Sequence, residues 1–511
     1  MAVRRTARIR TGALEGIDGI AVTAEIDISR GLPGFHLVGL PNAEVRESRE
    51  RVLSALRNSG QKVPLGKITV NLAPAGVRKT GASCDLAMAV GVLAAGRAIR
   101  LGPTERTGAT FLGELSLFGE VRPVRGLLAM VMEAAAAGCT QVVVPLTQVA
   151  EARLVSAVEA VGVHSLAEAV AWWEGGAGPG EATVLPSAKP DRGQVAPADT
   201  DLLWSDLAGQ PLVRKGAVMA AAGGHHCLLV GPPGTGKTRL ARRLGQLGPP
   251  LSRAEALEVT RIHSAVGRSP GLGLVQKRPF RAPHHSVTRA GLVGGGGGLR
   301  PGEVTLAHEG VLFLDEVSEF APAVLDGLRE PLEDARVTMV RGTGARTYPA
   351  NFQLVAAMNP CRCGFLGSET RACTCNAADI KRHRTRLSGP LLDRIDIFLE
   401  VGAWEGAFLT RDMNQKPSPQ GDNWRDCPRR SDLVRAGAML REWRQEPLVG
   451  RLSPTAAHFL DGARQPLGLS LRGVERCVAV AATAAALDGA GIISGDHVRE
   501  ALEFRREVLL V

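Results

Sequence analysis

The hydrophobic positions of the first 180 residues alternate between short runs of strand-forming residues and longer runs rich in alanine. ITVNLAP, ELSLFGEVRPV and QVVVPL have the composition of strands, whereas CDLAMAVGVLAAG and LLAMVMEAAAAG favour helices. This alternation predicts an α/β or α+β domain over residues 1 to 180. Residues 181 to 200 are rich in Gly, Pro and Ala without periodic apolar positions, which predicts a linker.

A second α/β unit is predicted over residues 201 to 400. Its apolar runs CLLV, VLFLD and FQLVAAMN are short and continuous, which is typical of parallel strands buried on both faces. Residues 401 to 430 lack such a pattern and predict an irregular connection. From residue 431 to residue 511 the apolar positions recur at helical spacing after capping residues, so this end predicts a helical domain.

Length, charge and cysteine content narrow the class of protein. A chain of 511 residues is too long for one core and favours three or four domains. Its net charge of +10 fits a polyanionic partner, first of all nucleic acid, although an arginine-rich composition alone gives the same excess. Nine cysteines, an odd number, favour a reducing compartment over a disulfide framework. No apolar segment follows the basic N-terminus, so we expect a cytoplasmic protein without membrane spans.

The segment GPPGTGKT follows the first predicted strand and precedes a helical segment. In this pattern, glycines let backbone N–H groups close around a nucleotide phosphate, the lysine reaches the β- and γ-phosphates, and the threonine hydroxyl binds Mg²⁺. The predicted nucleotide-binding residues are Gly231, Pro232, Pro233, Gly234, Thr235, Gly236, Lys237 and Thr238.

Polar residues at two further strand ends complete the predicted nucleotide site. Asp315 ends VLFLD, where it can hold the Mg²⁺ shell, and Glu316 beside it can polarise an attacking water. Asn359 ends FQLVAAMN and could orient that water. Alone, an acidic pair at a strand end is a solvated turn and Asn-Pro is a strand stop. Downstream of a phosphate-binding loop, these residues favour a hydrolytic site.

Arg394 lies in LSGPLLDRIDIF, between an apolar turn and an apolar run. This position can present a guanidinium on a surface, as an arginine finger that acts on a neighbouring subunit requires. The alternative is a surface arginine that pairs with Asp393 or Asp396.

Four cysteines, Cys361, Cys363, Cys373 and Cys375, form two C-x-C pairs within fifteen positions. Four thiolates can close a tetrahedral zinc site, and such a site is structural because it leaves no position open for a substrate. The alternative is a loop with four free thiols. A metal would fasten a basic insertion between Asn359 and Arg394.

RPFRAPHHSV, PGEVTLAHEGVLFLDE, LREPLEDARVTMVRG and LSGPLLDRIDI together resemble the magnesium-chelatase-like AAA+ proteins of the YifB and ComM family. GLPGFHLVGLPNAEVRESRERVLSALRNSG resembles the first domain of the same family. The resemblance implies ATP and Mg²⁺ as cofactors. It further implies Lys237 and Thr238 as Walker A, Asp315 and Glu316 as Walker B, Asn359 as sensor 1, Arg394 as the finger and Arg472 as sensor 2 of a helical lid.

The resemblance also implies a hairpin over residues 337 to 352, with Arg341 and Arg346 beside its turn, that points into the pore of a ring. Arginines without aromatic neighbours suit the phosphate backbone of DNA better than stacked bases. Flexible surface loops are the alternative.

The first domain resembles the Lon protease fold. Ser83 lies near the position of that fold's nucleophile, but Leu128 stands where the catalytic lysine is expected. Because a serine needs a base to act as a nucleophile, we expect a domain without peptidase activity that serves as a scaffold or docks a partner.

These features predict an ATP-hydrolysing, homo-oligomeric ring, hexameric by resemblance, that moves along DNA. Resemblance to ComM implies branch migration in recombination or natural transformation. One alternative is a protein-remodelling motor of the metal-chelatase subunit kind. A second is a scaffold with a degenerate phosphate-binding loop, against which the intact Lys237, Asp315 and Glu316 argue.

Overall fold

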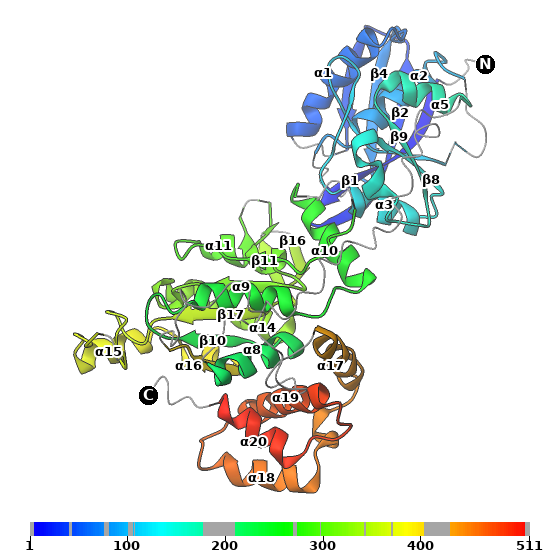
Figure 1. The fold of residues 1–511 in the computed structure, drawn as a ribbon. Coiled ribbons are helices and arrows are strands. Elements are labelled where there is room, and N and C mark those ends of the chain that lie inside the picture. The colour runs from blue at the N-terminus through cyan, green and yellow to red at the C-terminus, as the bar shows by residue number, and fades with distance from the viewer. Residues whose placement is uncertain are drawn as a thin grey trace, which may run out of the picture. The chain divides into compact units, whose positions relative to one another are not determined.

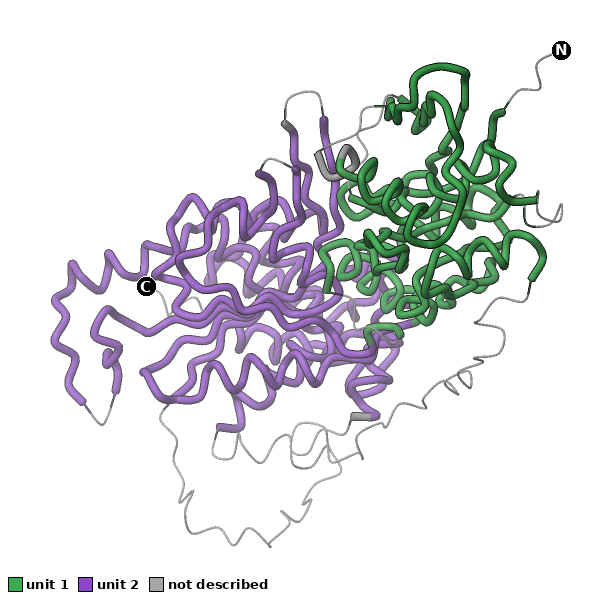
Figure 2. The backbone as a smooth tube through the Cα atoms, turned by 90° about the horizontal axis from the view of Figure 1, so that it is seen from above, with its two compact units in different colours: residues 1–192, 253–275 green, residues 193–252, 276–511 purple. Residues whose placement is uncertain are grey.

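The chain forms two compact units in a computed structural model (Figures 1 and 2): residues 1–192 with 253–275, and residues 193–252 with 276–511. The predicted linker, residues 181 to 200, and residues 403 to 429 of the predicted irregular connection lie outside the described residues. The structure describes residues 5–39, 43–75, 81–100, 106, 108–176, 210–268, 273–296, 298–341, 344–368, 371–402 and 430–505.

The first unit is built on a seven-stranded mixed sheet with the order β3-β4-β2-β1-β5-β8-β9. β1 and β2 form a long antiparallel pair, and β5, β8 and β9 extend the sheet in parallel. The strands are β1 (Thr6–Glu15), β2 (Asp18–Ser29), β3 (Gly34–Val38), β4 (Lys67–Ala73), β5 (Thr110–Phe111), β8 (Gln141–Pro145) and β9 (Glu159–Val163); a separate two-stranded ladder joins β6 (Glu114–Leu115) and β7 (Val121–Arg122).

Helices cover both faces of this sheet, because alternate residues of its strands enter different hydrophobic clusters. In β8, Val143 belongs to the cluster that contains α1, α2 and α5, whereas Val142 and Val144 belong to the cluster that contains α3 and α4. The alanine-rich runs in the sequence are therefore helices that pack closely on strands. These helices are α1 (Ala43–Asn58), α2 (Asp85–Ala95), α3 (Leu127–Ala136), α4 (Val149–Ala152) and α5 (Leu166–Trp173).

Helix α10 (Arg253–Ala265) belongs to the first unit, although the chain reaches it only after GPPGTGKT. Its Ser264 hydroxyl donates a 2.5 Å hydrogen bond to the buried carboxylate of Glu151, and its Arg261 lies 2.6 Å from the carboxylate of Asp18. The first unit is therefore discontinuous in sequence, a feature that the apolar pattern does not reveal.

The second unit contains a five-stranded sheet with the order β11-β14-β17-β10-β18, and its neighbouring strands pair in parallel. Every residue of β10, β14 and β17 is buried, which explains why the sequence shows continuous apolar runs there. The C-terminal ends of these strands meet at one edge of the sheet. The strands are β10 (Cys227–Val230), β11 (Phe280–Arg281), β14 (Val311–Leu314), β17 (Gln353–Met358) and β18 (Ile397–Glu400).

The C-terminal helices of the second unit share one hydrophobic core with its sheet. Leu399 of β18, Ala485 of α19 and Phe504 belong to the same cluster, and α8 packs against both α17 and α19. Figure 1 shows these helices gathered beside α8. The elements are α8 (Pro211–Gly223), α9 (Lys237–Leu247), α17 (Arg430–Trp443), α18 (Pro454–Arg464), α19 (Leu471–Asp488) and α20 (Gly495–Glu503).

The predicted fold class is confirmed: the chain combines mixed α/β units with a parallel-sheet core and a helical C-terminal segment. The three strands predicted from CLLV, VLFLD and FQLVAAMN coincide with β10, β14 and β17 to within a residue at each end. Among the residues that the structure describes, no helix is both long enough and apolar enough to cross a bilayer.

We expect the substitution Ser264→Ala to loosen α10 from the first unit, because it removes a donor from the buried carboxylate of Glu151. A buried group that loses a hydrogen-bond partner costs about 1–3 kcal/mol. Hydrogen exchange of the α10 amides in the full chain should accelerate accordingly. Ser286→Ala, which removes an exposed hydroxyl, is the control and should leave exchange in α10 unchanged. Equal protection of α10 in both variants would contradict the assignment.

Candidate functional site

The loop from Gly231 to Gly236 connects β10 to α9, and Pro233, Gly234 and Gly236 are exposed. Gly234 and Gly236 have φ of 83° and 87°, a left-handed conformation that favours glycine, and Gly236 directly precedes the first residue of α9. The first turn of a helix carries backbone N–H groups without partners in the helix, and these attract an anion. The loop therefore has the form of a phosphate cradle.

Lys237 lies at the base of this loop and contacts the end of the neighbouring strand. Its ammonium donates to the carbonyl oxygens of Gly231 and Pro232, each at 2.7 Å, and to Oδ1 of Asn359 at 3.2 Å. Burial lowers the pKa of Lys237 from its usual value, while the charges of Asp315 and Glu316 oppose this shift. The structure thus brings together the lysine and the asparagine that the sequence pattern singled out.

The end of β14 supplies the carboxylates of the site. The Thr238 hydroxyl donates to Oδ2 of Asp315 at 2.8 Å, so the two predicted Mg²⁺ ligands are in contact. Glu316 is exposed and has φ of 50°, an uncommon conformation for a residue with a side chain and one that is frequent at functional sites. A hydroxyl, an adjacent carboxylate and a phosphate cradle fit a Mg²⁺-nucleotide.

Arg394 lies at the opposite edge of the sheet from this cradle. β18 runs parallel to β10, with Ile397 opposite Cys227, and Arg394 precedes β18 by three residues. The phosphate-binding loop leaves the other end of β10, at least about 13 Å further along four strand residues. The arginine therefore faces away from the nucleotide site of its own chain.

The side chain of Arg394 is 8% exposed and pairs with Glu333. Its guanidinium also donates to the Pro390 carbonyl at 2.6 Å. The sequence pattern offered Asp393 or Asp396 as partners, and the structure selects a carboxylate from a distant helix, α14 (Arg329–Asp334). The expectation of an arginine presented on the surface thus differs from the structure, in which the guanidinium is retracted.

Arg472 meets the same carboxylate. Its Nη2 lies 2.5 Å from Oε1 of Glu333, and it occupies the first turn of α19. Four residues along this helix, Arg476 lies 3.1 Å from the buried carboxylate of Asp396. The residue matched to sensor 2 therefore lies next to the finger arginine at the edge of the sheet that carries Arg394.

Two buried histidines, which the sequence analysis left without a role, fix this edge. The backbone N–H of His226 donates to Asp396 at 2.7 Å, and Nδ1 of His226 accepts from the Leu354 N–H at 3.1 Å. His225 contacts the Thr483 hydroxyl of α19 at 2.7 Å. Burial lowers the pKa of each histidine to about 4. In the sequence, only their position immediately before the β10 strand could have indicated that they are buried.

The predicted hairpin is present as β15 (Arg336–Arg341) paired with β16 (Gly344–Pro349). Arg346 lies in β16, and the side chain of Arg341 lies outside the described residues. The buried Tyr348 donates from its hydroxyl to the carbonyl of Leu299 at 2.7 Å, so the hairpin is fastened to the glycine-rich loop before β13 (Arg300–Pro301). The hairpin and the glycine-rich loop, which are distant in the sequence, are therefore in contact.

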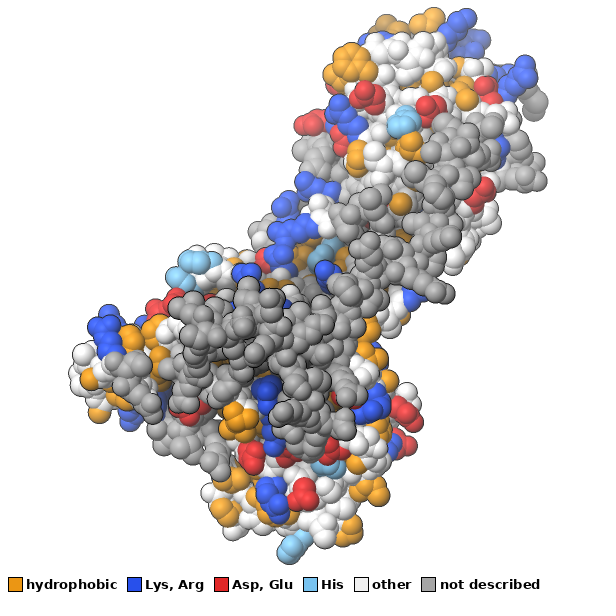
Figure 3. All heavy atoms as spheres, viewed as in Figure 1, with side chains coloured by type: hydrophobic (Ala, Val, Ile, Leu, Met, Phe, Trp, Pro, Cys, Tyr) orange, Lys and Arg blue, Asp and Glu red, His pale blue; other side chains and the backbone are white. Residues whose placement is uncertain are grey.

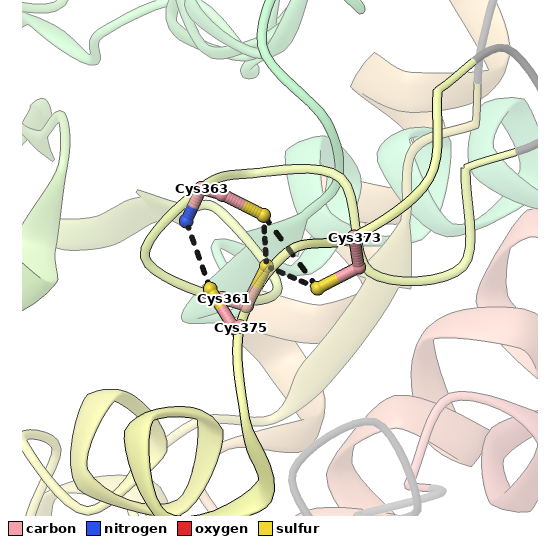
Figure 4. Close-up of side chains that lie close together, drawn as sticks. All are labelled: Cys361, Cys363, Cys373 and Cys375. Carbon is pink, nitrogen blue, oxygen red and sulfur yellow. Dashed lines mark hydrogen bonds between the residues drawn. The ribbon is translucent and has the colours of Figure 1, made fainter.

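The four cysteines of the insertion converge (Figure 4). Sγ of Cys361 lies 3.4 Å from Sγ of Cys363 and 3.6 Å from Sγ of Cys373, and all four sulfur atoms lie within 4.8 Å of one another. Tetrahedral zinc with Zn–S bonds of about 2.3 Å places its sulfur atoms about 3.8 Å apart. The arrangement therefore fits a closed zinc site with no ligand position left for chemistry.

The cysteine cluster adjoins the phosphate-binding loop and carries a basic helix. Gly364, between the two cysteine pairs, packs so closely on Pro233 that a Cβ at this glycine would lie 2.8 Å from the proline ring. His383 of α15 (Ala377–Arg384) contacts the Asn359 carbonyl at 3.0 Å. Figure 3 shows Lys and Arg side chains where α15 lies, and the last turn of this helix contains Lys381, Arg382 and Arg384.

Ser83 of the first unit is buried and its hydroxyl donates to the Gly12 carbonyl at 2.8 Å. Leu128 is fully buried, so the site matched to a peptidase dyad offers an occupied hydroxyl and an apolar partner. Among these two residues and Gly12, which the structure describes, none is a base that could activate the serine.

Comparison with known proteins identifies the class to which these sites belong. Residues 203–408 match the family model described as magnesium chelatase, subunit ChlI, residues 24–148 match the model described as subunit ChlI of Mg-chelatase, and residues 435–505 match its C-terminal model. The chain is thus a magnesium-chelatase-like AAA+ protein.

Relatives that match the chain over almost its full length identify its family within this class. The chain is 42% identical over 518 residues to Rv2897c of Mycobacterium tuberculosis, with 97% of each chain covered. It is 38% identical over 501 residues to YifB of Escherichia coli and 37% identical over 505 residues to competence protein ComM of Haemophilus influenzae, in each case with 97% of this chain and 96% of the relative covered. The chain belongs to the YifB and ComM family.

Part of the chain also resembles a protease. Lon protease 2 of Bacillus subtilis is 32% identical over 141 residues, which make up 26% of either chain. This match supports the Lon-like fold.

We expect the purified protein to hold about one zinc ion per chain, and Cys373→Ser with Cys375→Ser to remove it. Two thiolates of four cannot close a tetrahedral site. Metal content measured by mass spectrometry should fall close to zero in this variant. Cys139→Ser, a change at a buried cysteine outside the cluster, should retain the metal. A wild-type protein purified without chelators that contains no zinc would refute the assignment.

Proposed function

We propose that the protein is an ATP-hydrolysing ring motor that acts on DNA as a translocase or branch-migration helicase. The proposal rests chiefly on the placement of two half-sites at opposite edges of one parallel sheet. Lys237, Asp315 and Asn359 converge at the C-terminal edge, whereas Arg394 belongs to the other edge. Because the nucleotide-binding residues and the arginine lie apart in one chain, the arginine of a neighbouring copy is needed to complete each site.

In this proposal, Thr238 and Asp315 hold Mg²⁺ on the β- and γ-phosphates, and Lys237 exchanges its carbonyl partners for phosphate oxygens. Glu316 polarises the attacking water, which the Asn359 amide orients. Arg394 and Arg472 of the adjacent subunit then neutralise charge on the transferring phosphoryl group. The carboxylate that Arg472 shares with Arg394 supports placing Arg472 in the neighbour's site and not over the nucleotide of its own chain.

DNA as the substrate is supported by the charge of the chain, by the hairpin and by one relative. The net charge of +10 favours a polyanion, and the β15–β16 hairpin carries Arg346 without exposed aromatic residues beside it. ComM of Haemophilus influenzae is named a competence protein. We therefore propose a hexameric ring in which these hairpins line a pore that admits DNA.

A protein-remodelling motor of the metal-chelatase subunit kind is the second candidate. The family models that match residues 24–148, 203–408 and 435–505 all carry that name. The two candidates share the ATPase chemistry and differ in the substrate that stimulates it.

The finger assignment predicts that Arg394→Ala spares ATP binding and lowers kcat by at least about 100-fold, because trans-acting arginines contribute on the order of 10³–10⁵ in related hydrolases. Mixing Arg394→Ala subunits with Lys237→Ala subunits should restore hydrolysis, since each variant supplies the half that the other lacks. Arg499→Ala, a change at an exposed arginine of α20, should hydrolyse ATP like the wild type. An Arg394→Ala variant with undiminished kcat would remove the arginine finger from the mechanism.

The substrate assignment predicts that DNA raises steady-state ATP hydrolysis, most of all with four-way junctions. Rates should be compared without DNA and with single strands, duplex and junctions. Glu316→Gln serves as the blank, because it retains the nucleotide-binding residues and loses the group that activates water. Rates indifferent to every DNA would favour the protein-remodelling candidate.

A further inference from the structure

Glu333 is the point at which two arginines from distant parts of the chain meet. Arg394 precedes strand β18, and Arg472 belongs to the helical segment. One carboxylate oxygen of Glu333 contacts Arg394, and the other lies 2.5 Å from Arg472. Glu333 lies within the segment LREPLEDARVTMVRG, but the sequence gives it no role, since the pairing depends on three segments coming together.

The shared carboxylate of Glu333 offsets the repulsion between the two guanidinium groups. Two guanidinium groups this close repel each other, and the Arg394 side chain is 8% exposed, so its charge is poorly hydrated. Glu333 is the carboxylate that the structure places against both groups. The hydrogen bond from Arg394 holds the pKa of Glu333 below its usual range, with further contributions from the charges of Arg472 and Arg476. Glu333 is therefore ionised at neutral pH.

The same glutamate is joined to the hairpin through α14. This helix ends at Asp334, and β15 begins at Arg336. In the helix, Glu330 accepts a hydrogen bond from the backbone N–H of Thr338 at 3.0 Å. The Ala350 N–H donates to the Ala335 carbonyl at 2.8 Å, which closes the base of the hairpin. Short hydrogen bonds thus join the helix that carries Glu333 to the base of the hairpin.

We propose that Glu333 is a positioning residue that holds Arg394 and Arg472 as a pair for the nucleotide of the neighbouring subunit and ties this pair to the β15–β16 hairpin. The inference rests on the proposed function, in which both arginines act in trans. Without Glu333 the two cations separate, and the neighbour's γ-phosphate meets one of them at a time. Movement of the pair toward the phosphate pulls on α14, and the hairpin at its end responds.

The substitution Glu333→Gln tests the positioning role, because it keeps the size of the side chain and removes its charge. We expect kcat for ATP hydrolysis to fall about tenfold while KM for ATP stays within about twofold, since the nucleotide-binding half is untouched. Glu333→Asp, which restores the charge, should recover part of the rate. Glu475→Gln, a change at an exposed acid of α19, should leave kcat unchanged.

Subunit mixing separates positioning from a general structural role. Glu333→Gln subunits keep an intact phosphate-binding loop, so added Lys237→Ala subunits, which keep intact arginines, should raise the rate above the sum of the two alone. Mixing Glu333→Gln with Arg394→Ala should give no such gain, because both changes damage the same half. An unchanged kcat in Glu333→Gln, or a fall that Lys237→Ala subunits do not relieve, overturns the inference. Undiminished hydrolysis by Arg394→Ala alone instead overturns the part of the proposed function in which this arginine acts on the neighbouring subunit.

Discussion

Parallel pairing of β10 with β17 on one side and β18 on the other is the constraint on which the second unit depends. Because the strands point the same way, the residues that follow β10, β14 and β17 meet at one edge, and those that precede β18 lie at the other. Lys237 and Asn359 thereby come within hydrogen-bond distance, and Arg394 is kept from both. In the proposed ring, Arg394 is far from Lys237 of its own subunit and close to Lys237 of the neighbouring subunit.

Buried polar groups hold the edge that carries Arg394. Asp396 accepts from the backbone of His226 and from Arg476, while His225 contacts Thr483 in the same helix as Arg476. The contacts of Arg476 and Thr483 tie the starts of β18 and β10 to α19, and the contact of His226 with Asp396 ties the two strands to each other. The apolar core beneath these groups fixes how the helical segment packs, and the polar contacts fix its register, because a misplaced buried charge is costly. Arg472 reaches Glu333 as a result of this register.

Elements that rely on local pattern could be predicted from the sequence, and features that rely on long-range pairing could not. β10 and β14 are continuous apolar runs, as is β17 after Gln353, and Asp315 and Asn359 directly follow β14 and β17. The spacing of GPPGTGKT likewise identifies its residues directly. Glu333 has no assigned partner in the sequence and Asp396 is expected beside Arg394, whereas the tertiary fold pairs Glu333 with Arg394 and Asp396 with Arg476. The retracted position of Arg394 depends on Glu333 and was unpredictable for the same reason.

The insertion with four cysteines illustrates the intermediate case. Two C-x-C pairs indicate that thiols could gather, and the structure brings their sulfur atoms within 4.8 Å of one another. That the intervening Gly364 packs on Pro233 could not be inferred, since the contact joins the insertion to the phosphate-binding loop across more than a hundred residues of sequence.

The discontinuity of the first unit sets an order of events during synthesis. The ribosome delivers the seven strands of its sheet first, then the linker, β10 and α9, and only afterwards α10. The carboxylate of Glu151 therefore waits for Ser264 until more than a hundred further residues have emerged. Completion of the N-terminal unit on a nascent chain is thus tied to the appearance of β10 and α9 of the next one, so the two units cannot mature strictly one after the other.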